Sequence, residues 1–427
     1  MEGNQQWSDA APDPQGANGP ALFDILWVID NGASMCGAQQ TLRNGIAHFA
    51  DLLLDADIDF HLGFTTTHPL QCEDVDPGDH RYEACQQEPV ARPGHLQATP
   101  QPIPAHEPAC VHPIFPSGHS QAGEHDLATL DPLTDTMELA VSCTKSPAEW
   151  ESLLWYDEHE LRCALPGQPL VDNCEQFDSD LADFFPPQQA YRDIPQILRR
   201  QDYTVDETGS IDEEALKADL FCASLVGTRG YAFGQGLAMA VKAVSSEMTG
   251  GPGGDPQDYP NAGLLRPDAN TSIIFVSNEN DCSHDGGLDE TTPCGVHNCT
   301  IEENLGDEGH LIPVEDLFED FMENLAASKG LAEVNPDTVH PVSIHGPHRR
   351  VAPEDIPVQC PAEGEIWSIE PSCHTEMGRG WSGHRYEYFL RQFPTFFPPP
   401  FEGYPDDPIE GLICQNFGPI LFGPSDF

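Results

Sequence analysis

Residues 22–35, with the sequence LFDILWVIDNGASM, constrain the fold of this chain more than any other stretch. The first eight are apolar apart from Asp24, and they lead directly into a turn that contains Asp30 and Ser34. A short apolar run rich in Ile, Val and aromatic residues is typical of a strand buried on both faces, as in parallel sheets. The Asn and Gly after Asp30 end the strand. We therefore predict a buried strand whose carboxyl end presents hard oxygen ligands, where open α/β sheets bind their ligands.

Residues 271–277 (TSIIFVS) form a second run of this kind, and it ends in a cluster that includes Asn278, Glu279 and Asp281. If this strand lies parallel to the first, both polar clusters lie at the same edge of the sheet. This expected convergence is the main indication of a divalent-cation site.

Helical and extended patterns alternate along much of the remaining chain. Apolar residues at helical spacing predict helices over residues 39–54, 147–156, 178–185, 211–225, 235–248, 314–325, 385–393 and 412–421. Further strands are predicted over residues 59–67 and 339–344. The alternation predicts an α/β fold, with a doubly wound, mostly parallel sheet flanked by helices.

The regular pattern is largely lost between residues 68 and 209, where Cys, Pro and His are frequent. So long a loop is unusual inside a compact domain. We interpret residues 68–209 as a disulfide-rich insertion within one domain formed by residues 21–67 and 210–425. Residues 1–20, rich in Gly, Pro and Gln, are predicted to be a disordered linker.

The chain is strongly acidic, with 71 Asp and Glu against 18 Lys and Arg and a net charge of −53. This charge repels phosphate backbones and anionic lipids, so we expect neither nucleic acid nor a membrane surface as partner. Cations are better candidates, although acidity also serves simply to keep a surface solvated. No apolar run is long enough to span a membrane, and no signal peptide is recognisable in this sequence.

Fourteen cysteines without a CxxC pair indicate disulfides formed in an oxidising compartment, either extracellular, at the cell surface or periplasmic. The spacing leaves several pairings open: Cys294 with Cys299, and Cys360 with Cys373 or Cys414. Two zinc sites are alternatives, one among the histidines of residues 68–209, the other formed by Cys282, His284, Cys294, His297 and Cys299. Both have irregular ligand spacing.

These motifs resemble the von Willebrand factor A domain, and more narrowly its secreted or lipoprotein-type bacterial members. The resemblance is carried by DILWVIDNGASM at residues 24–35, by Gly-Thr at 227–228 before a helix, and by IIFVSNENDCS at 273–283. It extends to GHRY at residues 383–386 and ICQNF at 413–417. Such domains bind Mg²⁺ or a similar ion at a metal-ion-dependent adhesion site, where the ion keeps one position open for a carboxylate of a partner protein.

The resemblance implies a ligand set drawn from three separate turns of this chain. Asp30 and Ser34 belong to the first turn, Thr228 to the second and Asn278 to the third. Mg²⁺, or Ca²⁺ or Mn²⁺ in its place, is the expected ion. Cys36 and Cys282 follow the first and third turns, so a disulfide between them would join these two turns.

Two positions depart from the family pattern. Gly32 stands where the family has a Ser ligand, and Asn278 stands where it has an Asp. The protein charge at the ion therefore falls to that of Asp30 unless Glu279 or Asp281 also contributes. Because Mg²⁺ binds through few carboxylates and several waters, a degenerate site of this kind still suits it. The alternative is a retained fold whose metal site has lapsed.

Catalytic motifs are missing from the sequence: it contains no HExxH, GxSxG or Walker motif, and no GxGxxG that opens a helix after a strand. We therefore expect a non-enzymatic, monomeric, extracellular protein-binding or adhesion module that captures an acidic side chain of its partner. One alternative is a structural surface protein stabilised by disulfides, with an inert loop edge. Another is a hydrolase whose active site lies in the histidine-rich insertion.

Overall fold

The structure is a computed structural model of the chain. It describes residues 20–32, 35–69, 92–98, 155–157, 162–164, 194–205, 209–227, 233–286, 288, 299, 309–345, 373–375, 378–380, 383–394 and 411–412. All statements below concern these residues.

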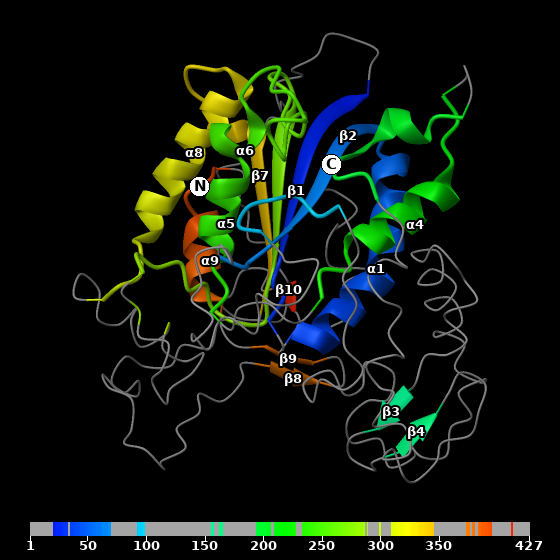
Figure 1. The fold of residues 1–427 in the computed structure, drawn as a ribbon, viewed down its shortest axis with the longest axis vertical. Coiled ribbons are helices and arrows are strands. Elements are labelled where there is room, and N and C mark those ends of the chain that lie inside the picture. Colours follow the sequence, from blue (N-terminus) through cyan, green and yellow to red (C-terminus); the bar gives the residue numbers. More distant parts are fainter. Residues whose placement is uncertain are drawn as a thin grey trace, which may run out of the picture.

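A six-stranded sheet forms the centre of the described structure, with strand order β10-β7-β6-β1-β2-β5 (Figure 1). The strands are β1 (Ala21–Ile29), β2 (Ile58–Thr66), β5 (Leu198–Arg199), β6 (Asn270–Val276), β7 (Val339–His345) and β10 (Gly411–Leu412). All neighbours pair in parallel except β5, which runs antiparallel to β2. The structure thus confirms an α/β fold with a mostly parallel sheet, and it places the predicted first strand near the middle.

Helices cover both faces of this sheet (Figure 1). The helices are α1 (Cys36–Asp55), α4 (Glu213–Ala223), α5 (Gly236–Ala243), α6 (Ser246–Thr249), α8 (Val314–Lys329) and α9 (His384–Leu390). Helices α1 and α4 pack on one face, and α5, α8 and α9 pack on the other. The cap of α4 is Asp212, whose side chain accepts a hydrogen bond from Ala215 N.

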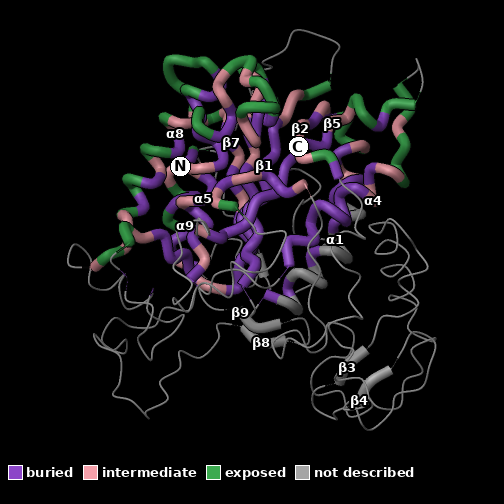
Figure 2. The backbone as a smooth tube through the Cα atoms, viewed as in Figure 1, coloured by how far each residue is buried: buried purple, intermediate pink, exposed green. Residues whose placement is uncertain are grey.

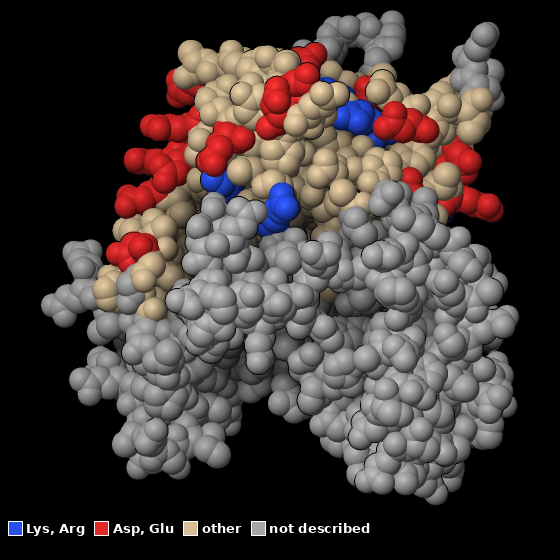
Figure 3. All heavy atoms as spheres, viewed as in Figure 1, with Lys and Arg blue, Asp and Glu red and all other residues tan. Residues whose placement is uncertain are grey.

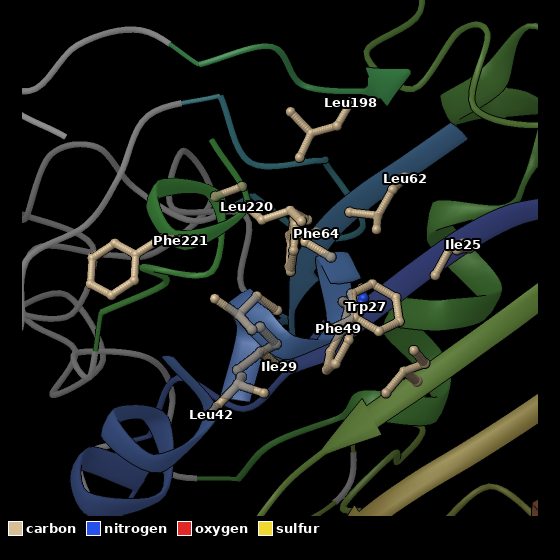
Figure 4. Packing of buried hydrophobic residues seen from close by; sticks show 14 of the residues in the cluster. Ile25, Trp27, Ile29, Leu42, Phe49, Leu62, Phe64, Leu198, Leu220 and Phe221 are labelled. Atoms are coloured by element: carbon tan, nitrogen blue, oxygen red, sulfur yellow. The ribbon is translucent and has the colours of Figure 1, made fainter. Parts of the chain in front are cut away.

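The core consists of two apolar layers, one on each side of the sheet (Figure 2). Along β1, Ile25, Trp27 and Ile29 face α1 and α4, while Leu26 and Val28 face the helices of the opposite side. The Trp27 ring meets Phe49 of α1 edge-on at 5.2 Å and stacks on Phe64 of β2 at 5.9 Å (Figure 4). Burial on both faces is why β1 reads as a continuous apolar run.

The structure describes only one end of two predicted helices, residues 155–156 of 147–156 and residue 412 of 412–421, and these residues are in strands. Gly411–Leu412 forms strand β10, which adds to the open edge of β7. Trp155–Asp157 forms strand β3, which pairs antiparallel with β4 (Arg162–Ala164), as suits residues with high strand propensity. Strands β8 (Cys373–Thr375) and β9 (Gly378–Gly380) form a second small hairpin.

Parts of the predicted insertion, residues 68–209, belong to the central body. Strand β5 pairs with β2, and Gln97 N donates a hydrogen bond of 2.7 Å to Phe64 O of the same strand. Leu96 is buried in the core layer beneath α5 and α8. Most of the remaining insertion, like residues 1–19, lies outside the described residues, so its status as a separate unit stays a prediction.

Asp24, the polar residue inside β1, anchors the amino-terminal edge of the sheet. Its carboxylate accepts hydrogen bonds from Arg266 Nε at 2.8 Å and from Arg266 N at 2.6 Å, and it lies 3.4 Å from Lys329 Nζ. Lys329 also donates to Ala269 O and Arg266 O. Both the Asp24 and the Lys329 side chains are buried, so β1, the loop before β6 and the end of α8 share one buried ion pair.

The acidic residues gather on the surface, as Figure 3 shows over the side that α8 occupies in Figure 1. The exposed face of α8 carries only acids among its charged residues: Glu315, Asp316, Glu319, Asp320 and Glu323. These carboxylates are solvated rather than gathered at a site. Within the described part of the chain, none of the helices has the length and apolarity needed to cross a membrane.

Candidate functional site

The carboxyl-terminal ends of β1, β2 and β6 meet at one edge of the sheet, and Asp30 lies between them. Asp30 N donates to Val276 O of β6 at 2.8 Å, and Ser277 Oγ donates to Asp30 Oδ2 at 2.7 Å. From β2, Thr67 N donates to Ile29 O at 3.3 Å. The first and third predicted turns therefore come together at one edge, as the parallel pairing of their strands requires.

Both carboxylate oxygens of Asp30 accept hydrogen bonds. Oδ1 receives the backbone N–H of Gly32 at 2.8 Å and the hydroxyl of Thr67 at 3.3 Å, while Oδ2 receives the hydroxyl of Ser277. The side chain is buried, and this burial raises the pKa of Asp30 above its usual value although the three hydrogen bonds act to lower it. Asp30 is therefore held in one orientation by groups from β1, β2 and the end of β6.

Two glycines at the start of α5 make room for these contacts. A Cβ on Gly234 would lie 3.0 Å from Thr67 Oγ1 and 3.5 Å from Asp30 Oδ2. A Cβ on Gly236 would overlap the hydroxyl of Tyr386. The Gly-Gln-Gly sequence thus lets α5 begin directly against the polar edge.

Tyr386 of α9 reaches the same edge from the far side of the sheet. Its hydroxyl lies against Gly236 at the start of α5, and its ring lies 5.2 Å from Phe275 and 6.4 Å from His345, measured between ring centroids. Burial, together with the nearby carboxylates of Asp281 and Asp30, raises the pKa of Tyr386 well above its ordinary value. The phenol is therefore neutral at physiological pH.

The remainder of the third turn holds helices in place. Asp281 accepts hydrogen bonds from Leu237 N at 2.9 Å and from Ser283 N at 3.0 Å, and it forms an ion pair with Arg385 at 3.2 Å. The exposed fraction is 0% for the Asp281 side chain and 4% for that of Arg385. Asn280 Oδ1 accepts from Arg385 N at the start of α9. The turn thereby joins β6 to the first turns of both α5 and α9.

The other predicted ligands are placed as follows. Ser34 and Thr228 lie outside the described residues. Asn278 is buried, and its backbone N–H points at the sulfur of Met35 at 3.0 Å, which brings the start of α1 to the same edge. Glu279 is half-buried, and its N–H donates to Ser277 Oγ at 3.1 Å.

The donors at this edge are hard oxygens, the ligand type that Mg²⁺ and Ca²⁺ prefer. They include the carboxylate of Asp30, the hydroxyls of Thr67 and Ser277, and the side-chain oxygen of Asn31, which is buried without a hydrogen-bond partner. Within the described residues no group of three or more His, Cys, Asp or Glu side chains is placed to hold a metal.

A buried disulfide joins Cys282, which directly follows the third turn, to Cys299, with their Cα atoms 5.3 Å apart. The predicted pairings of Cys282 with Cys36 and of Cys294 with Cys299 are therefore wrong. The predicted zinc site that used Cys282 and Cys299 is wrong as well, because disulfide sulfurs do not act as thiolate ligands. Sequence spacing failed here because disulfide connectivity depends on the packing of loops. Cys222 is also disulfide-bonded.

Sequence reasoning did not identify Thr67, Ser277 and Tyr386 as parts of this site. For Thr67 and Ser277 a signal existed, because each is a polar residue at the carboxyl end of a predicted strand, as Asp30 is. Tyr386 entered only through the family resemblance of residues 383–386, since nothing in its local sequence indicates that it reaches β6. No pattern in the sequence indicated that Gly234 and Gly236 are needed to leave room at the start of α5.

Buried histidines predict a loss of stability in acid. Burial lowers the pKa of His68, next to Thr67, to about 4, and burial together with Arg266 lowers that of His61 to about 4. Between pH ~6.5 and about 4, these two histidines are protonated in the unfolded chain but neutral in the folded chain. The stability that is present above pH ~6.5 is therefore lost as the pH falls to about 4.

For the more buried His68 we expect a loss of about 1.4 kcal/mol per pH unit in this window. Urea unfolding at pH 7.5, 6 and 5 measures the slope. The double variant His61→Gln/His68→Gln is expected to flatten it, and an unchanged slope would contradict the assignment.

Comparison of the sequence with models of known protein families and with curated proteins finds no match.

Proposed function

We propose that this chain is a non-enzymatic, extracellular protein-binding module with a degenerate metal-ion-dependent adhesion site. The proposal combines the resemblance of residues 24–35 and 273–283 to the von Willebrand factor A domain with the chemistry of the edge around Asp30. In it, Asp30, Ser34, Thr228 and Asn278 surround Mg²⁺ or a similar ion. The ion supplies a Lewis-acidic position that accepts a carboxylate of another protein.

One observation carries the proposal. Asp30 and Ser277 come from strands whose sequence positions are far apart, and they are joined by a hydrogen bond of 2.7 Å at the carboxyl edge of a mostly parallel sheet. Open α/β sheets bind ligands at this edge. The oxygen donors there belong to three different strands or turns, so an ion bound among them is held by the fold as a whole.

The described contacts refine the roles of the predicted residues. Asp281 lies at the same edge, but its charge is compensated by the buried ion pair with Arg385, whereas the hydrogen bonds described for Asp30 come from neutral groups. We therefore assign Asp281 to the support of α5 and α9, and Asp30 to the ion. With one carboxylate at the ion, binding is expected to be weak and to depend on water ligands.

Ion binding is expected to raise the melting temperature. A ligand that binds only the folded chain, present at about 100 times its Kd, stabilises by about 2.7 kcal/mol. We expect the melting temperature, measured by differential scanning calorimetry, to rise by several degrees relative to a sample in EDTA as the concentration of MgCl₂, MnCl₂ or CaCl₂ is increased in 10-fold steps.

The variant Asp30→Asn is expected to lose this rise, whereas Asp285→Asn, an exposed acid outside the edge, keeps it. Identical melting curves of the natural chain with each ion and with EDTA would remove the ion from the proposal.

The second candidate is a structural surface protein with an inert loop edge. The buried disulfide between Cys282 and Cys299 and the use of Asn280 and Asp281 as supports for helices favour it. It predicts that reductant lowers the melting temperature strongly while chelator has no effect. A divalent-ion response that Asp30→Asn abolishes would decide against this candidate.

A further inference from the structure

We propose that Asn31–Gly32 is a latent deamidation site, and that the carboxylate of Asp30 keeps it inactive by holding the backbone amide of Gly32. An asparagine followed by glycine deamidates readily in peptides, because glycine has no Cβ to hinder attack on the asparagine side chain. In this chain the pair directly follows Asp30, just after the end of β1. No ion is needed for the protection.

Deamidation of this pair has two steps. The Gly32 nitrogen first loses its hydrogen and attacks Cγ of Asn31, so that a new C–N bond forms and Nδ2 leaves as ammonia. Water then opens the resulting five-membered imide at one of its two carbonyl groups, which gives aspartate or isoaspartate. Overall one water is consumed and one ammonia is released, and neither an oxidant nor a cofactor takes part.

Asp30 opposes the first step. Its Oδ1 accepts the Gly32 N–H at 2.8 Å, so the nitrogen that must attack Asn31 is directed toward Asp30. Loss of the hydrogen would place a negative charge beside the carboxylate. A hydrogen bond to the neutral form and a nearby like charge both make such an ionisation less favourable. The hydroxyls of Thr67 and Ser277 fix the carboxylate in this position.

Burial opposes both steps. The exposed fraction is 4% for Asp30 and 2% for Asn31, and Asn31 Oδ1 has no hydrogen-bond partner. Hydroxide and water therefore reach the Asn31 amide only when the turn after β1 opens locally. The rate of conversion then follows the population of this open state, because the reaction itself is slow compared with opening and closing.

Conversion damages the folded edge and is irreversible. It replaces the amide of Asn31 with a carboxylate next to that of Asp30, at an edge where the guanidinium of Arg385 is already paired with Asp281. A buried charge without a partner is costly, and isoaspartate also lengthens the backbone between β1 and α1 by one methylene. The variant Asn31→Asp, which carries one of the two products, is therefore expected to have a lower melting temperature.

The test incubates the full chain in mildly alkaline buffer and follows residue 31 by peptide mass spectrometry, where each conversion adds about 1 Da. We expect slow conversion in the folded natural chain and fast conversion in concentrated urea. The variant Asp30→Ala removes the acceptor of the Gly32 N–H. Because a hydrogen bond to a charged group is lost, we expect Asn31 to convert about tenfold faster in this variant.

A second pair of the same sequence, Asn44–Gly45 within α1, is the internal control. Global unfolding exposes both pairs, whereas release of the turn after β1 exposes only Asn31. The variant Asp24→Asn, at the opposite end of β1, destabilises the chain with Asp30 intact, so we expect it to leave the ratio of the two rates unchanged. We expect Asp30→Ala to raise this ratio about tenfold, and an unchanged ratio would overturn the proposal.

If Asp30→Ala does not fold, Asp30→Asn gives the answer, with fragment ions distinguishing residue 31 from residue 30. Its side-chain oxygen still accepts the Gly32 N–H, but without the negative charge the protection weakens, so Asn31 is expected to convert faster than in the natural chain. Slower conversion would show that the carboxylate promotes the reaction as a base, and would overturn the proposal. Equal rates for the natural chain when folded and in urea would overturn it as well.

Discussion

Replacing Asp281 with Asn is expected to lower the free energy of unfolding by about 3–5 kcal/mol, because it leaves the buried charge of Arg385 without its partner. The loss has a second source. The groups that face Asp281 are Leu237 N, Ser283 N, the Ser283 hydroxyl and the Arg385 guanidinium, all of which donate to the carboxylate, so an amide NH₂ would place a donor among donors. Urea unfolding followed by circular dichroism measures the change.

The matched control is Asp285→Asn, four residues further along the same loop. The Asp285 side chain is 65% exposed and faces His310 at 3.6 Å, so its loss is expected to cost less than about 1 kcal/mol. The double variant Asp281→Asn/Arg385→Met removes both buried charges and is expected to recover part of the stability. If Asp281→Asn instead abolished the divalent-ion response at unchanged stability, Asp281 would be a ligand and not a support.

Replacing Asp24 with Asn is expected to be similarly costly, at about 3–5 kcal/mol, although Asp24 lies at the opposite end of β1. The carboxylate neutralises Lys329, whose side chain is 2% exposed, and receives two hydrogen bonds from Arg266. Burial opposes the charge of both partners, and removing only one of them leaves the other buried and uncompensated. Chemical denaturation at pH 7 measures the loss.

Asp59 provides the comparison for Asp24. It pairs with the same Arg266 at 3.1 Å, but its side chain is 38% exposed, so Asp59→Asn is expected to cost less than about 1 kcal/mol. In the double variant Asp24→Asn/Lys329→Met, most of the lost free energy of unfolding is expected to be regained. Equal effects of Asp24→Asn and Asp59→Asn would show that the buried pair does not dominate this edge.

Much of the fold could be predicted because apolar runs in buried parallel strands leave a strong local signal. Residues 22–29 and 271–277 are such runs, and they became the neighbouring strands β1 and β6. The wrong predictions fall where local sequence is ambiguous. Leu412 was assigned to a helix by its apolar neighbours, but an open edge of β7 recruited it as a strand.

The candidate site was harder to predict, because a residue type does not show which of its possible partners the fold supplies. Asp30 and Asp281 looked alike in the sequence, each an acid after a buried strand. In the structure Asp30 accepts hydrogen bonds from the hydroxyls of Thr67 and Ser277. Asp281 instead forms an ion pair with Arg385 and accepts a hydrogen bond from the first turn of α5. Only the long-range packing of the fold distinguishes a candidate metal ligand from a residue that holds helices in place.

The central position of β1 also has a consequence for synthesis of the chain on the ribosome. One edge of β1 pairs early with β2, but the other waits for β6, which begins at residue 270. At about 5–20 residues per second, the more than two hundred residues between β2 and β6 take roughly 10–40 s to emerge. During that interval the nascent chain presents an open apolar strand edge, so its early folding depends on dilution or on a chaperone that shields the edge.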